Sequence, residues 1–223
     1  MTRRICAVLM AAILCFTLGN TAHIAVAEED YPADTFTGFV NQSDLCATIR
    51  DDQTGEVYYL DMIVEEVDRS DNSVKYGVYI PSRLLNGENT IDGYDNSYSA
   101  YCTLKIKYQL QEYSMGISGG YAYLLTEVSG TWAVQVYNVS VTDVSVTYGC
   151  SGAGYNGPVT QVNTIEPYWY GGGFSQLTGF TSYVLDYWAG DVGAYMTLRF
   201  QMGSTRSWSF TMMNKILNSG TGF

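Results

Sequence analysis

Histidine is almost missing from this sequence, and its one occurrence, His23, lies in an N-terminal stretch with the features of an export signal. Once that stretch is removed, no imidazole remains. This absence excludes hydrolases that pair a Ser or Cys nucleophile with a His base. The sequence also contains no CxxC pair, which together with the missing histidine argues against a zinc site.

Residues 1–27 show the three parts of a cleaved signal peptide. Arg3 and Arg4 give a positive start, an apolar run follows over 5–18, and residues 25–27 read Ala-Val-Ala, a small-x-small cleavage site. The apolar run is shorter than the ~20 residues that a helix needs to cross a bilayer. We therefore predict a secreted, extracellular protein that begins at Glu28, with no transmembrane segment in the mature chain.

Basic residues are scarce. Without the leader, nine Lys and Arg remain against 22 Asp and Glu, so the mature chain is acidic, with a net charge of −13. This field repels phosphate backbones and anionic lipid, so nucleic acid is excluded as a partner. The simplest role of the charge is to keep an exported protein soluble by self-repulsion.

Helical periodicity is lacking after the leader, and apolar residues instead alternate with polar ones. The clearest case is the stretch 101–111, where Cys102, Leu104 and Ile106 share one face and Lys105 and Lys107 share the other. One buried and one wet face is typical of antiparallel sheets. The sequence predicts an all-β fold: an antiparallel β-sandwich or irregular barrel of about ten strands.

Residues 28–42 are acidic and without periodicity, which predicts a flexible lead-in, and 43–223 are expected to form a single all-β domain. A division near Gly149 is the alternative. Within this domain 57–65 is predicted as one strand, Ser129-Gly130 as a hairpin connection, and 149–173 as a Gly-rich loop. The last hairpin is expected to pair 194–200 with 208–212 across 203–205.

Cys46, Cys102 and Cys150 remain after leader cleavage. Cys102 and Cys150 alternate in phase with apolar residues on core-facing sides, whereas Cys46 is out of phase with its apolar neighbours. Export permits disulfides, so we predict a bridge between Cys102 and Cys150. Two buried free thiols are the alternative.

The sequence contains two possible cofactor-binding patterns, but the residues around them do not support binding, so no cofactor is predicted. Residues 152–157 fit GxGxxG, but β-branched residues follow where the dinucleotide fingerprint requires a helix. Asp92 and Asp95 place oxygen ligands in one tight loop with Gly93, as calcium requires, although without EF-hand spacing. Ordinary turn chemistry is the preferred interpretation of this loop.

Aromatic residues are the most unusual feature, because Tyr alone contributes 20 residues. Tyr108, Trp132 and Trp208 fall at inward strand positions, where core packing explains them. Others lie in two stretches rich in Gly, Asn and Asp, a composition typical of binding loops. The candidate ligand-binding residues are Tyr94, Tyr98, Tyr155, Tyr168, Trp169 and Tyr170.

Three functions follow from these observations. The first is a secreted noncatalytic β-sandwich that binds a carbohydrate or protein partner at the cell surface or in the medium. The second is a His-free glycoside hydrolase or lyase that uses two carboxylates, drawn from Glu65, Glu66, Glu112, Glu127, Asp143, Glu166 and Asp186. The third is a structural envelope component without a ligand.

Overall fold

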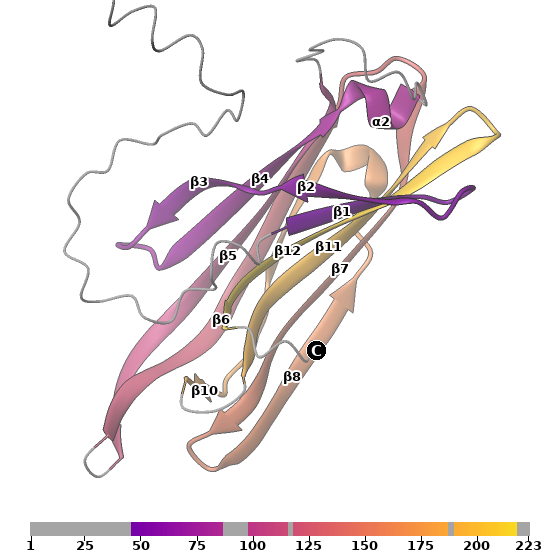
Figure 1. The fold of residues 1–223 in the computed structure, drawn as a ribbon. Coiled ribbons are helices and arrows are strands. Elements are labelled where there is room, and N and C mark those ends of the chain that lie inside the picture. Colours follow the sequence, from indigo (N-terminus) through magenta and orange to yellow (C-terminus); the bar gives the residue numbers. More distant parts are fainter. Residues whose placement is uncertain (1–45, 87–97, 116–117, 187–189, 218–223) are drawn as a thin grey trace, which may run out of the picture. The chain divides into compact units, whose positions relative to one another are not determined.

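The computed structural model describes residues 46–86, 98–115, 118–186 and 190–217. These residues all belong to one unit of the chain, Gly38–Phe223. Twelve strands within the described residues form two six-stranded antiparallel sheets that pack as a sandwich (Figure 1). The predicted all-β class is confirmed, and of the two predicted architectures the structure has the sandwich.

The first sheet has the strand order β2-β1-β12-β11-β7-β8. Its strands are β1 (Cys46–Asp51), β2 (Val57–Asp61), β7 (Val139–Gly154), β8 (Gly157–Ile165), β11 (Asp191–Met202) and β12 (Arg206–Leu217). β11 and β12 form the predicted last hairpin, with Leu198 opposite Phe210. Their alternating apolar side chains are buried because one face of the sheet covers the core.

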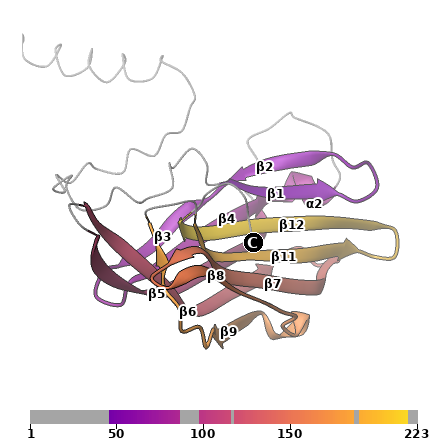
Figure 2. The same ribbon diagram turned by 90° about the horizontal axis from the view of Figure 1, so that it is seen from below.

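The second sheet has the order β10-β6-β5-β4-β3, and β9 pairs with β6 beyond the end of β10. Its strands are β3 (Ile63–Asp68), β4 (Ser73–Pro81), β5 (Tyr98–Met115), β6 (Ser118–Val134), β9 (Gly173–Leu177) and β10 (Val184–Leu185). Two short helical turns complete the described elements: α2 (Ser82–Asn86) and the 3₁₀ turn η2 (Trp169–Gly171). Figure 2 shows β9 and β3 at opposite edges of this sheet.

The core lies between the sheets, and the predicted inward positions fill it. Cys102, Leu104 and Ile106 are fully buried, as is the alternating set on β11 and β12. Tyr108, Trp132 and Trp208 are also buried, as predicted. Asn214 is one of the polar residues buried among the described strands, and its Nδ2 donates hydrogen bonds of 2.9 Å to the carbonyl oxygens of Val74 and Leu104 on the facing sheet.

Three sequence predictions of local structure are wrong. The stretch 57–65 is not one strand, because the chain passes from the first sheet to the second at Met62, between β2 and β3. Ser129-Gly130 is not a turn, since β6 runs through it without interruption. The stretch 149–173 is not one loop: residues 149–154 belong to β7 and residues 157–165 form β8, and these two strands make a hairpin.

Candidate functional site

Three consecutive aromatic residues, Tyr168, Trp169 and Tyr170, lie on the surface at η2, and we call them the aromatic turn. Tyr168 is 76% exposed, Tyr170 71% and Trp169 47%. The rings of Tyr168 and Tyr170 stack with centroids 5.5 Å apart, and Trp169 meets Tyr170 edge-on, also at 5.5 Å. The three rings therefore form one exposed group whose members support one another.

The backbone of the aromatic turn is held by Trp132 of β6. The indole Nε1 of Trp132 donates a 2.9 Å hydrogen bond to the carbonyl oxygen of Trp169, and its backbone amide donates one of 3.0 Å to Gly172. Gly172 has φ 69°, the left-handed conformation that glycine adopts without strain, and here the chain enters β9. The side chains thus project outward from a backbone fixed by a buried residue.

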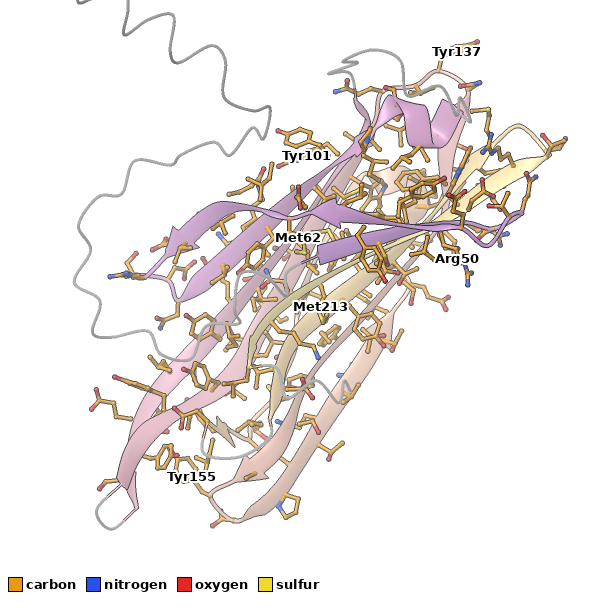
Figure 3. The ribbon with its side chains drawn as sticks, in the orientation of Figure 1. Arg50, Met62, Tyr101, Tyr137, Tyr155 and Met213 are labelled. Atoms are coloured by element: carbon orange, nitrogen blue, oxygen red, sulfur yellow. The ribbon has the colours of Figure 1, made fainter. Side chains whose placement is uncertain are left out.

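The two parts of the predicted 149–173 binding loop lie far apart. Tyr155 lies in the turn that joins β7 to β8, whereas the aromatic turn follows the other end of β8. Figure 3 labels Tyr155 at the end of the β7–β8 hairpin. The structure therefore separates Tyr155 from the other predicted residues of this stretch.

The strand register places Tyr98 near the end of β6 that also carries Trp132. Tyr98 begins β5 opposite Pro81, and Ala100, two residues later, pairs with Val134 at the end of β6. Trp132, which holds the aromatic turn, is two residues before Val134 on the same strand. Tyr94, Asp92 and Asp95 lie outside the described residues, so the binding role of Tyr94 and the calcium alternative for the two aspartates stay predictions.

A pocket of about 240 Å³ opens beside Tyr155, and we call it the tyrosine pocket. It lies between the β7–β8 turn and the segment before β10. Its lining residues come from these two segments: Tyr155, Asn156, Gly157, Pro158, Val159, Thr181, Ser182 and Tyr183. Of these residues, only Tyr155 is among the candidates predicted from the sequence.

The segment 181–183 was missed because its partners are distant in sequence. Gln161 of β8 accepts hydrogen bonds at Oε1 from the amides of Thr181 and Ser182, and its Nε2 donates one of 2.9 Å to the Ser182 carbonyl. The Tyr183 hydroxyl donates a 2.7 Å bond to Gln109 of β5. A polar Gln within the β-branched run 159–165 was the available signal, but it does not identify its partners.

Cys102 and Cys150 are both buried, as predicted, but both are free thiols, so the predicted disulfide is not present. Cys102 pairs with Trp132 of β6, whereas the Cys150 Sγ accepts a 3.2 Å hydrogen bond from the amide of Leu125 on the same strand. Seven residues of strand separate these two points, roughly 20 Å. A disulfide needs Cα atoms within ~7 Å, so the register rules the bridge out. Burial raises the pKa of the Cys150 thiol to about 12.

Several of the acids proposed for catalysis form ion pairs with lysine on the outer face of the second sheet. Glu65 contacts Lys75 at 2.7 Å, Glu66 contacts Lys105 at 3.2 Å, and Glu127 contacts Lys107 at 3.7 Å. Asp186 accepts hydrogen bonds from the Tyr113 hydroxyl and the Tyr121 amide. These contacts account for the four carboxylates as parts of the sheet.

Asp51 and Asp52, two acids at the β1–β2 turn, also have structural partners. Burial raises the pKa of the Asp51 carboxyl, but hydrogen bonds from Arg206 and from the amides of Gln53 and Thr54 outweigh it, so the pKa lies below its ordinary value. The pKa of Asp52 is likewise lowered, because hydrogen bonds from two serine hydroxyls and nearby arginines outweigh burial. Both carboxylates fix the β1–β2 turn against β12.

In the described part of the chain, no group of three or more His, Cys, Asp or Glu side chains is placed to hold a metal ion. None of its helices is long and apolar enough to cross a membrane. Comparison of the whole chain with protein-family models, curated proteins and solved structures finds no match.

Proposed function

We propose that this chain is a secreted, noncatalytic β-sandwich protein that binds an extracellular carbohydrate through the aromatic turn. One observation supports the proposal above the others: Tyr168, Trp169 and Tyr170 stand at the surface on a backbone that Trp132 holds in place. A role in packing would bury these rings, because each ring gains its stabilising free energy from leaving water. Fixed, exposed rings lose little conformational entropy when a ligand arrives.

The shape of the aromatic turn favours an extended ligand. Small molecules bind in concave pockets that enclose most of their surface, whereas these rings project from a 3₁₀ turn with no buried residue. Rings of this kind offer flat apolar faces with phenol hydroxyls at their edges, which match the C–H faces and hydroxyls of a glycan chain. The net charge of −13 favours a neutral glycan over an acidic one.

The proposal is noncatalytic because four of the seven acids that the sequence offered for glycoside hydrolysis have other partners. Glu65, Glu66 and Glu127 form ion pairs with lysines, and Asp186 accepts two hydrogen bonds. A glycosidase needs one protonated acid and one free carboxylate facing each other across the bond to be cut. The described contacts of these four residues do not supply that arrangement.

Binding to a glycan array and to insoluble polysaccharides tests the proposal with the secreted chain and two variants. Trp169→Ala removes one ring and keeps the carbonyl that Trp132 bonds, so we expect glycan binding to weaken about 30-fold, the equivalent of ~2 kcal/mol. Tyr59→Ala is the matched control, because Tyr59 is 74% exposed but lies on β2 at the edge of the other sheet. We expect its binding to equal that of the parent.

Three outcomes contradict the proposal. If no glycan binds the parent, the carbohydrate assignment is wrong. If a surface protein binds instead and Trp169→Ala abolishes that binding, the aromatic turn is a protein interface. If Trp169→Ala lowers the melting temperature strongly and the parent has no ligand, the rings serve packing, and a structural envelope role takes the place of binding.

Export has a separate test. The signal-peptide pattern predicts that protein recovered outside the cell begins at Glu28. N-terminal sequencing of the medium and cell fractions measures this directly. An intact Met1 on the mature protein would contradict secretion with cleavage.

A further inference from the structure

The tyrosine pocket lies at the opposite end of β8 from the aromatic turn, and its construction differs. We propose that it binds a single neutral sugar ring, either a free monosaccharide or the terminal residue of a glycan. This inference shares its ligand class with the proposed function but depends on different residues. The argument rests on the fixed walls of the pocket, its neutral lining and its size.

Each wall of the pocket is held by a hydrogen bond or ring contact from outside it. Gln161 holds the backbone of Thr181 and Ser182 with three hydrogen bonds through one amide group. Gln109 accepts a 2.7 Å hydrogen bond from the Tyr183 hydroxyl, and this bond sets the direction of the Tyr183 side chain. A wall that is fixed before binding costs less entropy when a ligand enters.

The opposite wall is the ring of Tyr155, and a second set of contacts supports it. Tyr113 of β5 meets this ring edge-on, with centroids 6.3 Å apart. Tyr113 is itself bound, since its hydroxyl donates a 3.0 Å hydrogen bond to Asp186. Tyr155 remains 48% exposed, so one side of the ring stays open for stacking while another is supported.

The lining selects a neutral, hydroxylated ligand. All of the described residues around the pocket are uncharged, so they offer an ionic ligand no opposite charge to offset its lost hydration. Asn156, Thr181, Ser182 and Tyr183 carry amide and hydroxyl groups that both donate and accept hydrogen bonds. Tyr155 and Pro158 add apolar surface for the C–H face of a sugar.

The size of the pocket limits the ligand to one ring. Its volume of about 240 Å³ is below the ~300 Å³ at which pockets for drug-sized molecules begin. The pocket is therefore too small to enclose an oligosaccharide. A longer glycan could place only its terminal residue between Tyr155 and Tyr183.

An NMR titration of the ¹⁵N-labelled mature chain tests the inference with glucose, galactose, mannose and N-acetylglucosamine, and with glucuronic acid as the charged comparison. We expect at least one neutral sugar to shift the amide signals of 155–159 and 181–183. Tyr155→Ala should lower the affinity for that sugar at least tenfold. Ser182→Trp should lower the affinity to a similar extent, because the larger side chain fills the pocket. The variant keeps the wall in place, since Gln161 bonds only the backbone of Ser182.

Tyr59→Ala is the matched control, because Tyr59 is exposed on β2 and lies outside both proposed sites, and it should change monosaccharide affinity less than twofold. An unchanged melting temperature verifies that each variant is folded. The inference is overturned if no neutral sugar binds, if the shifts occur elsewhere, if Tyr155→Ala binds like the parent, or if glucuronic acid binds as tightly as the neutral sugars. Loss of polysaccharide binding in Trp169→Ala tests the proposed function alone, so failure of one proposal is separable from failure of the other.

Discussion

Replacing Gly130 with alanine tests whether this glycine is fixed by close packing. Gly130 lies in the interior of β6, opposite Leu104 of β5 and Phe174 of β9. A Cβ at this position would lie 2.7 Å from Cε1 of Phe174 and 2.8 Å from the backbone oxygen of Thr103. Both distances are shorter than van der Waals contact. The Phe174 ring can turn aside, but the Thr103 carbonyl belongs to a central strand and cannot.

The expected cost follows from overpacking. Extra methylene-sized groups in a packed interior cost ~1–3 kcal/mol. For a domain of this size each kcal/mol lowers the melting temperature by ~2–4 °C, so Gly130→Ala should lower it by about 2–12 °C. Because β9 begins at Gly173, just after the aromatic turn, displacement of Phe174 should also weaken the polysaccharide binding that we propose for this turn.

Thermal denaturation followed by circular dichroism measures this effect, with Gly171→Ala as the matched control. A Cβ on Gly171 meets no atom within 4 Å, and its φ is outside the left-handed range. Gly171→Ala should therefore melt within about 1 °C of the parent, a small surface effect. Equal melting temperatures for the two variants would refute the reasoning from close contact.

Three further predictions concern the core and the edge of the sandwich. Asn214→Leu leaves two carbonyls without their buried donor and should cost ~2–5 kcal/mol in urea denaturation, so a smaller loss contradicts the inter-sheet role. Cys102 and Cys150 should react with iodoacetamide only after unfolding, as measured by peptide mapping; a disulfide-linked peptide would contradict the free thiols. The folded-state pKa of Asp51 is lowered, so its stabilising contribution is present above its unfolded pKa of ~4 and is lost as pH falls through the folded value. Asp51→Asn should therefore reduce the acid sensitivity of unfolding below about pH 4, and an unchanged acid limb would contradict this.

The alternation of apolar and polar residues predicted the central strands correctly, because each of these strands buries only one of its faces. Residues 102–108 of β5 and the β11–β12 hairpin keep their alternation and lie in the core as expected. Along β7 the buried apolar positions change from odd numbers at Val141 to even numbers at Val144. A bulge explains this change, since Asp143 pairs with Arg199 and Val141 with Phe200. Strands and bulges of this kind can be predicted from sequence, because the positions of the apolar residues identify the buried face of each strand.

Glycine misled the prediction where its role is packing rather than turning. Ser129-Gly130 resembles a hairpin connection, yet Gly130 is there because Phe174 and Thr103 leave no room for a side chain. The close approach comes from β9, more than 40 residues away in the sequence, so no local pattern reveals it. The stretch 149–173 was also mispredicted as a loop because of its glycines. Residues 149–154 and 157–165 form strands instead, because β7 pairs with both β11 and β8.

The candidate site was predicted in part. Tyr168, Trp169 and Tyr170 were identified from composition, but the hydrogen bond by which Trp132 holds their backbone joins residues 37 apart, so a sequence pattern does not reveal it. The tyrosine pocket was missed except for Tyr155. Its second wall, residues 181–183, is placed by Gln161 of β8, which lies 21 residues before Ser182, so only the folded chain brings the two walls together.

The length of β8 determines how the two sites can act together. Its nine residues separate the turn that carries Tyr155 from the segment that leads to Trp169, a distance of about 30 Å in extended strand. Sites this far apart with no shared contact should behave independently. The variant with both Trp169→Ala and Tyr155→Ala should therefore show a change in unfolding free energy equal to the sum of the single changes, within ~0.5 kcal/mol. A larger coupling would show that β8 transmits a change between its ends, and the two sites would then have to be treated as one.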